Sequence, residues 1–160
     1  MTIKVGDKLP NVTLTQATAE GPKPIQTEDF FKGRTVALFA LPGAFTPTCS
    51  AKHLPGFKQL APDLKKKGVD VIACLSVNDA FVMRAWGEDQ AVGDDIVMLG
   101  DGNGAFTEAV GLEMDGSKFG LGKRSQRYAM IVRDGKVKEL LVEPGPGLNA
   151  SSAESVLGKL

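Results

Sequence analysis

Hydrophobic residues of this chain gather in short continuous runs rather than in long alternating patterns. Residues 35–41 (TVALFAL) and 69–77 (VDVIACLSV) are mostly apolar and are bounded by glycine, proline or polar residues. A short run with apolar residues on both faces is typical of a strand buried on both sides of a sheet. A shorter run at residues 96–99 has the same character. The pattern therefore predicts three buried strands.

Helices are expected between these strands. Residues 50–67 fit a helix whose three final lysines precede Gly68 and face the negative end of its dipole. Pro55 and Pro62 fall inside this segment and predict a kink near the first proline. Further helical segments are expected at residues 27–29, from Asn78 or Asp79 to about Gln90, at 105–110 and at 153–160.

The two ends of the chain add strands to this core. Residues 128–133 and 136–142 form a predicted hairpin around Asp134-Gly135, a two-residue turn sequence. Near the amino end, residues 11–16 alternate weakly, and Pro22 and Pro24 lie in an expected connection. This order predicts an α/β fold in which a central mixed sheet has helices on both faces. Without repeats or a linker, residues 1–160 are expected to form one domain.

Charge and composition exclude several classes of function. The chain has 19 basic and 19 acidic residues, so it lacks the positive charge of a protein that binds nucleic acid or an anionic membrane. No apolar run is long enough to cross a bilayer, and the first ten residues lack the apolar core of a secretory signal. We expect a cytoplasmic protein, and an organellar location after removal of a transit peptide stays open. In such a compartment both cysteines are thiols at rest.

One of those cysteines follows an irregular stretch, PGAFTPTCS, at residues 42–50. If the strand ends at Leu41 and the helix begins near Thr48, Cys49 lies in the first helical turn. Unpaired N–H groups and the positive dipole end favour a thiolate there. The Thr46 hydroxyl can both donate to and accept from an oxygen-rich ligand beside the sulfur. The stretch therefore predicts a reactive thiol.

Three further residues are candidates for the same site. Arg127 starts the strand at 128–133 and reaches this end of the sheet if that strand lies beside residues 35–41. Pro42 would shield the thiolate from water, and His53 lies one turn after Cys49, where it can tune the site. No third ligand accompanies Cys49 and His53 in the sequence, so a metal site is not expected.

The stretch PGAFTPTCS contains the Pro-x-x-x-Thr-x-x-Cys signature of peroxiredoxins, and the chain resembles in particular their peroxiredoxin 5 or type II (plant-type) subfamily. The segments HLPGF, CLSVNDAFVMRAWG and RYAMIVRDGKVKELLVEPGPGL extend the resemblance over nearly the whole chain. It implies a thioredoxin-like fold and a peroxidase that uses no prosthetic cofactor. Cys49 would be the peroxidatic nucleophile that forms a sulfenic acid with hydrogen peroxide or a small alkyl hydroperoxide. Thr46, Arg127 and Pro42 would form its pocket, and the resemblance also implies a homodimer with Phe45 and Phe81 near the contact or the pocket rim.

How the sulfenic acid is reduced stays open in the sequence. Some members of the subfamily carry a resolving cysteine just after the segment EPxGxGL, but this chain reads GLNASSAES there. The second thiol, Cys74, follows Cys49 by 25 positions. This spacing resembles that of plant-type members in which the second cysteine has been assigned a resolving role. Cys74 lies in a predicted strand, and a bridge to Cys49 would require local unwinding of the helix. The alternative is an external thiol, either glutathione with glutaredoxin or thioredoxin.

Two other functions compete with a peroxidase. A thiol-disulfide oxidoreductase normally needs a Cys-x-x-Cys pair, which this chain lacks. A thiol-based redox sensor would react once with peroxide and pass the oxidation to a partner. Repeated turnover of peroxide with a reductant separates an enzyme from such a sensor.

Overall fold

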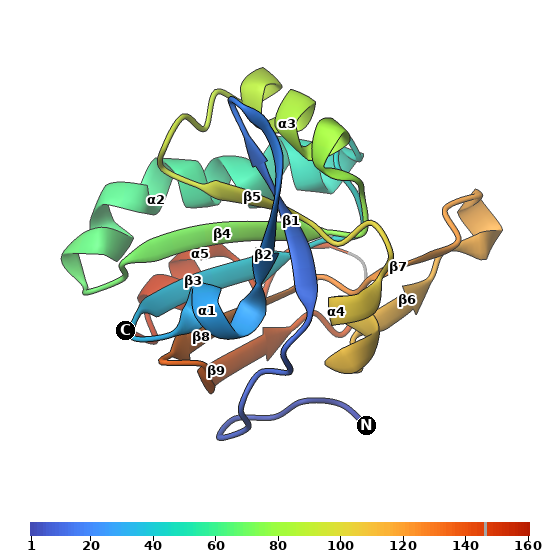
Figure 1. The fold of residues 1–160 in the computed structure, drawn as a ribbon. Coiled ribbons are helices and arrows are strands. Elements are labelled where there is room, and N and C mark those ends of the chain that lie inside the picture. Colours follow the sequence, from blue (N-terminus) through green and yellow to red (C-terminus); the bar gives the residue numbers. More distant parts are fainter. Residues whose placement is uncertain (146) are drawn as a thin grey trace.

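The computed structural model describes residues 1–145 and 147–160 and has a seven-stranded mixed sheet at its centre (Figure 1). In sheet order the strands are β2 (Gly21–Gln26), β1 (Thr13–Thr18), β5 (Val97–Gly100), β4 (Val71–Ser76), β3 (Thr35–Ala40), β8 (Tyr128–Arg133) and β9 (Lys136–Val142). The central strands β3, β4 and β5 are parallel, and the strands beside them are antiparallel. The three apolar runs of the sequence thus form the centre of the sheet, as predicted.

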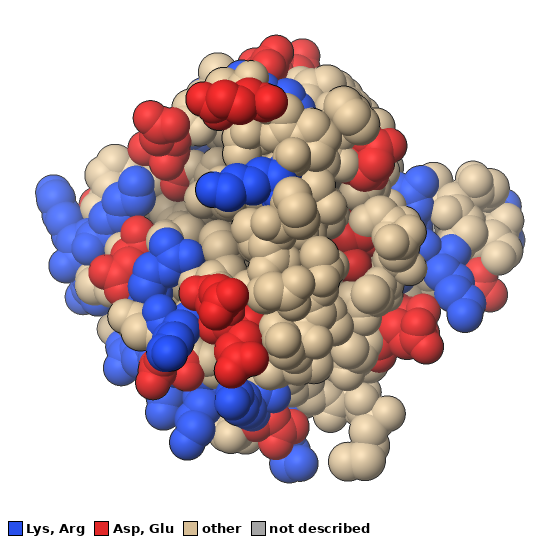
Figure 2. All heavy atoms as spheres, in the orientation of Figure 1, with Lys and Arg blue, Asp and Glu red and all other residues tan. Residues whose placement is uncertain are grey.

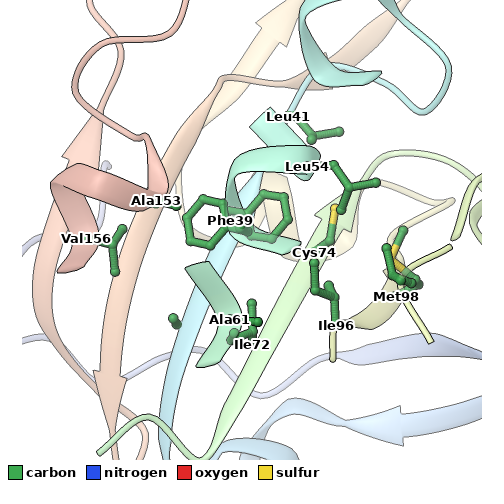
Figure 3. Close-up of a cluster of buried hydrophobic side chains, with 14 of the residues drawn as sticks. Phe39, Leu41, Leu54, Ala61, Ile72, Cys74, Ile96, Met98, Ala153 and Val156 are labelled. Carbon is green, nitrogen blue, oxygen red and sulfur yellow. The ribbon is translucent and has the colours of Figure 1, made fainter. Parts of the chain in front are cut away.

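Helices cover both faces of this sheet. The first face packs against α2 (Leu54–Lys66), α3 (Ala80–Asp89) and α5 (Ala153–Leu157), and the second against α1 (Thr27–Phe31) and α4 (Ala105–Ala109). Successive residues of β3 alternate between the two buried clusters, with Phe39 on the first face and Leu38 on the second. Figure 3 shows part of the first cluster, in which Phe39 and Cys74 lie with Leu54 of α2. The predicted α/β architecture is confirmed.

The hairpin between β8 and β9 also forms as predicted. Asp134 and Gly135 have φ values of 49° and 77°, the left-handed conformations that a type I′ turn needs at both central positions. Asp79, one of the two predicted caps, accepts a hydrogen bond from the Val82 N–H at 2.8 Å and begins α3.

The expected connection around Pro22 and Pro24 was wrong, because this segment is strand β2. β2 lies at the edge of the sheet and pairs only with β1 in the part of the chain that the structure describes. Alternate N–H groups of an edge strand point away from the sheet, so proline is tolerated where no ladder hydrogen bond is needed.

The sequence also missed a short hairpin and the form of the helix start. β6 (Glu113–Asp115) and β7 (Lys123–Ser125) pair in a separate two-stranded sheet around the 3₁₀ turn η2 (Ser117–Phe119), which projects from the body of the molecule (Figure 1). The helix expected at residues 50–67 starts with a π-helical turn, η1 (Cys49–His53), and continues as α2. The Leu54 N–H donates to the Cys49 carbonyl five residues earlier. Since Pro55 has no N–H to donate, the hydrogen-bond ladder is interrupted here, and it widens to π-helical spacing at the turn before the proline.

Within residues 1–145 and 147–160, no helix is both long and apolar enough to span a bilayer.

Candidate active site

The loop between β3 and η1 holds Cys49 at the carboxyl-terminal end of the central strands. The Thr46 hydroxyl donates to the Gly43 carbonyl at 2.7 Å, and the Ser50 N–H donates to the Thr46 carbonyl at 2.9 Å. From the neighbouring strand end, the Asn78 side-chain oxygen accepts the Ala44 N–H at 3.0 Å. The loop is therefore fixed at both ends, and Cys49 lies fully buried in the first turn of the helical segment, as predicted.

Arg127 reaches the Cys49 thiol from the adjacent strand. β8 runs antiparallel to β3 with Tyr128 opposite Ala40, so the residue before Tyr128 meets the chain where β3 ends. The Nη2 group of Arg127 donates to the Cys49 sulfur at 3.2 Å. The predicted convergence of the two residues is confirmed, and it places a permanent cation in hydrogen-bond contact with the sulfur.

His53 lies on the other side of the Arg127 guanidinium. Its Nδ1 atom is 2.9 Å from Nη1 of Arg127, and its Nε2 atom is 3.0 Å from the Ser151 carbonyl oxygen. Burial, helped by the charge of Arg127, lowers the pKa of His53 to about 3. The imidazole is therefore neutral at physiological pH and acts as a hydrogen-bonding group rather than as a cation.

Thr46 and Pro42 lie in the loop that precedes Cys49. The Thr46 hydroxyl uses its proton toward Gly43, which leaves its oxygen lone pairs as acceptors for a ligand. Pro42 is half-buried, and its carbonyl accepts from Nη1 of Arg124 at 3.3 Å. A Cβ at Gly43 would lie 2.9 Å from the same Arg124 atom, so a side chain there would displace the end of this arginine.

Cys74 belongs to the same buried cluster as Cys49 and lies in the middle of β4. It pairs with Phe39 of β3 on one side and Met98 of β5 on the other. Both cysteines are free thiols, and burial, with a smaller contribution from Cys49, raises the pKa of Cys74 well above its ordinary value. Cys74 is thus a protonated and poorly nucleophilic thiol.

Phe45 and Phe81 are exposed, with 52% and 72% of their surface accessible. Phe45 has the left-handed backbone conformation, at φ 63°. The centroid of its ring lies 6.5 Å from that of Trp86. Trp86 is buried and donates from Nε1 to the Ser50 hydroxyl at 3.0 Å, so it touches the residue after the thiol.

Sequence reasoning missed four residues that build this site: Asn78, Arg124, Glu143 and Ser151. Asn78, Arg124 and Glu143 contact main-chain groups of loops, and Ser151 contributes its own carbonyl to the His53 ring. Hydrogen bonds that involve main-chain groups leave no periodic signal in the sequence. Within the residues described, no group of three or more histidine, cysteine or acidic side chains is arranged to hold a metal ion.

Comparison with known proteins points to one family. The family model Redoxin matches residues 4–157. Chloroplastic peroxiredoxin-2E-2 of Oryza sativa is 54% identical over 99% of this chain and 73% of its own length. Peroxiredoxin-2B of Arabidopsis thaliana is 43% identical over 99% of this chain and 98% of its own. The crystal structure of reduced Prx3 from Vibrio vulnificus in complex with H₂O₂ is similar with a TM-score of 0.95 and 54% identity, covering 99% of both chains.

Proposed function

The chain belongs to the peroxiredoxins of the redoxin family, which have a thioredoxin-like fold and thiol peroxidase activity, and we propose that Cys49 is its peroxidatic residue. In this role the Cys49 sulfur is the atom that reduces the peroxide. The observation that carries the proposal is the Arg127 guanidinium, 3.2 Å from a cysteine sulfur at the start of a helix. A guanidinium in contact with the sulfur can bind and orient a peroxide beside it and stabilise the charge that develops during the reaction.

In the proposed reaction the Cys49 thiolate attacks one oxygen of a hydroperoxide. A sulfur–oxygen bond forms and the oxygen–oxygen bond breaks, which oxidises the cysteine to a sulfenic acid and reduces the peroxide. The departing oxygen takes a proton and leaves as water or as an alcohol. Negative charge gathers on this oxygen in the transition state, so the donors of Arg127 lower the barrier. Thr46 accepts a hydrogen bond from the bound peroxide, and Pro42 limits access of water.

We propose that an external thiol reduces the sulfenic acid. Cys74 supports this choice by its position, because it is fully buried and held in the sheet between two neighbouring strands. To bond with Cys49 it would have to leave the sheet, or η1 would have to unwind onto it. An incoming thiol such as glutathione, with glutaredoxin, or a thioredoxin would also need the loop around the buried Cys49 to open, but it would leave the central sheet intact. The second substrate is then a dithiol or a pair of monothiols, which ends as a disulfide.

We propose a homodimer in which Phe45 and Phe81 contribute to the contact. Their exposure, together with the location of Phe45 in the active-site loop, supports a surface that association would cover. Acidic and basic side chains are interspersed on the face that Figure 2 shows, as expected of a protein whose partners are peroxides and thiol proteins rather than nucleic acid. The peroxidase needs no prosthetic group in this scheme. A cytoplasmic or chloroplast-like compartment supplies the reducing thiols.

Turnover of hydrogen peroxide with glutathione and glutaredoxin, or with thioredoxin and its reductase, tests this function. We expect wild type to turn over repeatedly with at least one system, Cys49→Ser to be inactive and Cys74→Ser to keep most of its activity. Full activity in Cys49→Ser would overturn the assignment of Cys49. Loss of activity in a folded Cys74→Ser variant would instead make Cys74 the resolving thiol, and a single oxidation without turnover would indicate a redox sensor.

A further inference from the structure

We propose that Glu143 and Ser151, neither of which touches the thiol, position Arg127 through His53. The proposal rests on the proposed role of Arg127 at Cys49. A chain of hydrogen bonds connects Glu143 at the end of β9 to Ser151 before α5, then to the His53 ring, to the Arg127 guanidinium and to the Cys49 sulfur. Ser151 is fully buried, His53 is 1% exposed and Glu143 is 7% exposed, so water competes little for these bonds.

Glu143 anchors the far end of this chain. One of its carboxylate oxygens accepts from the Ser151 N–H at 2.6 Å, from the Ser151 hydroxyl at 2.7 Å and from the Asn149 N–H at 3.0 Å. Burial raises the pKa of Glu143, but the hydrogen bonds from Ser151, Ala150 and Asn149 outweigh it and the net pKa is lowered. The carboxylate is therefore ionised at neutral pH and fixes the Ser151 main chain.

Fixing Ser151 fixes the tautomer of His53. The Ser151 carbonyl can only accept a hydrogen bond, so the Nε2 atom of His53 must carry the proton. Arg127 can only donate, so the Nδ1 atom must be unprotonated and accept from it. Only the neutral Nε2–H tautomer satisfies both neighbours, and the lowered pKa of His53 agrees with it.

A fixed imidazole in turn fixes the plane of the guanidinium. Nη1 of Arg127 points at His53 and Nη2 points at the Cys49 sulfur, so the two bonds share one rigid plane. If Ser151 moves, the His53 ring loses its acceptor and can turn, and Nη1 loses its partner. Arg127 is then free to swing away from the sulfur. Glu143 and Ser151 together thus act as a brace for the cation at the thiol.

The matched variants are Glu143→Gln and Glu154→Gln. Glu143→Gln removes the charge at the anchor, while Glu154→Gln removes the same charge from an exposed position in α5 and serves as the control. We expect the second-order rate constant for oxidation of the reduced protein by hydrogen peroxide to fall about tenfold in Glu143→Gln and to stay within twofold in Glu154→Gln. In an Arg127→Gln background Glu143→Gln is expected to add less than a further twofold, since its effect passes through Arg127.

A second readout needs no peroxide and so separates the brace from the proposed function. His53 is the only histidine in the chain, so a long-range ¹H–¹⁵N NMR spectrum of its ring has a single set of signals. We expect the neutral Nε2–H tautomer from pH 5 to 8 in wild type and in Glu154→Gln. Glu143→Gln should show a mixture of the two tautomers or exchange-broadened signals.

If the His53 imidazole of wild type is charged at pH 5, or carries its proton on Nδ1, the proposal is overturned even if no variant folds. Unchanged ring signals and an unchanged peroxide rate in a folded Glu143→Gln variant overturn it as well. Altered ring signals with an unchanged peroxide rate would leave the brace in place and refute the proposed role of Arg127 instead.

Discussion

Replacing Arg127 by glutamine tests the contact on which the reaction scheme depends. The variant keeps a side chain of similar shape and an amide donor, but it removes the positive charge that lies 3.2 Å from the Cys49 sulfur. It also removes the group that donates to His53 at 2.9 Å. The fold should survive, because Arg127 precedes β8 and is only partly buried.

The magnitude follows from the kind of hydrogen bond that is lost. A hydrogen bond to a charged group contributes about 1.5 to 3 kcal/mol. At about 1.4 kcal/mol for each factor of ten, its loss slows peroxide attack roughly 10- to 150-fold. Arg127→Lys should fall between this variant and wild type, because one ammonium group is a point donor and cannot hold both the sulfur and the imidazole in a single plane.

Stopped-flow fluorescence of reduced protein mixed with hydrogen peroxide measures this rate. Trp86 is the only tryptophan and donates to Ser50, the residue after the thiol, so oxidation of Cys49 changes its surroundings. Arg133→Gln removes the same charge from the exposed far end of β8 and is the matched control. An Arg127→Gln rate within twofold of wild type, with the fold intact, would refute the role assigned to the guanidinium.

Three further predictions follow from the same geometry. Thr46→Val should slow peroxide attack about tenfold in the stopped-flow assay, because it removes a hydroxyl that costs about 1.4 kcal/mol to lose, while Thr46→Ser stays near wild type. Cys74→Ser should lower the free energy of unfolding in urea by about 1 to 3 kcal/mol, because it places a hydroxyl in an apolar strand; an unchanged midpoint would contradict the packing described. Unfolded His53 titrates near its ordinary pKa of 6.5 and folded His53 at about 3, so only the unfolded state gains a proton between these values. The free energy of unfolding therefore loses nothing from His53 above pH 6.5 and about 3 kcal/mol at pH 4. Urea titrations should show a steeper dependence of this free energy on pH in wild type than in His53→Gln.

The central strands and the contact between Cys49 and Arg127 could be predicted from the sequence because each follows from a simple physical constraint. Continuous apolar runs can be buried only inside the sheet, and Arg127 reaches Cys49 once β8 pairs with β3. The π-helical turn at Cys49 was missed because the periodicity of five residues cannot distinguish it from an α-helix. β6 and β7 have three residues each, too few for an alternating pattern.

The hydrogen bonds of Glu143 and Ser151 could not be predicted from the sequence for a different reason. Ser151 contributes its carbonyl and its N–H, groups that every residue except proline has, and their direction depends on the path of the loop. Arg124 likewise contacts the main chain of Pro42 rather than a complementary side chain. Hydrogen bonds to main-chain groups do not depend on the type of the residue that supplies the group, so they can be identified only when the fold is known.

The central claim is that Cys49 is the thiol that peroxide oxidises, and trapping the sulfenic acid tests it most directly. Reduced protein is treated with one equivalent of hydrogen peroxide in the presence of dimedone, digested, and the peptides that contain Cys49 and Cys74 are compared by mass spectrometry. We predict the dimedone adduct on Cys49 and none on Cys74, which is buried and held as a protonated thiol. An adduct on Cys74 with Cys49 unmodified would contradict the account.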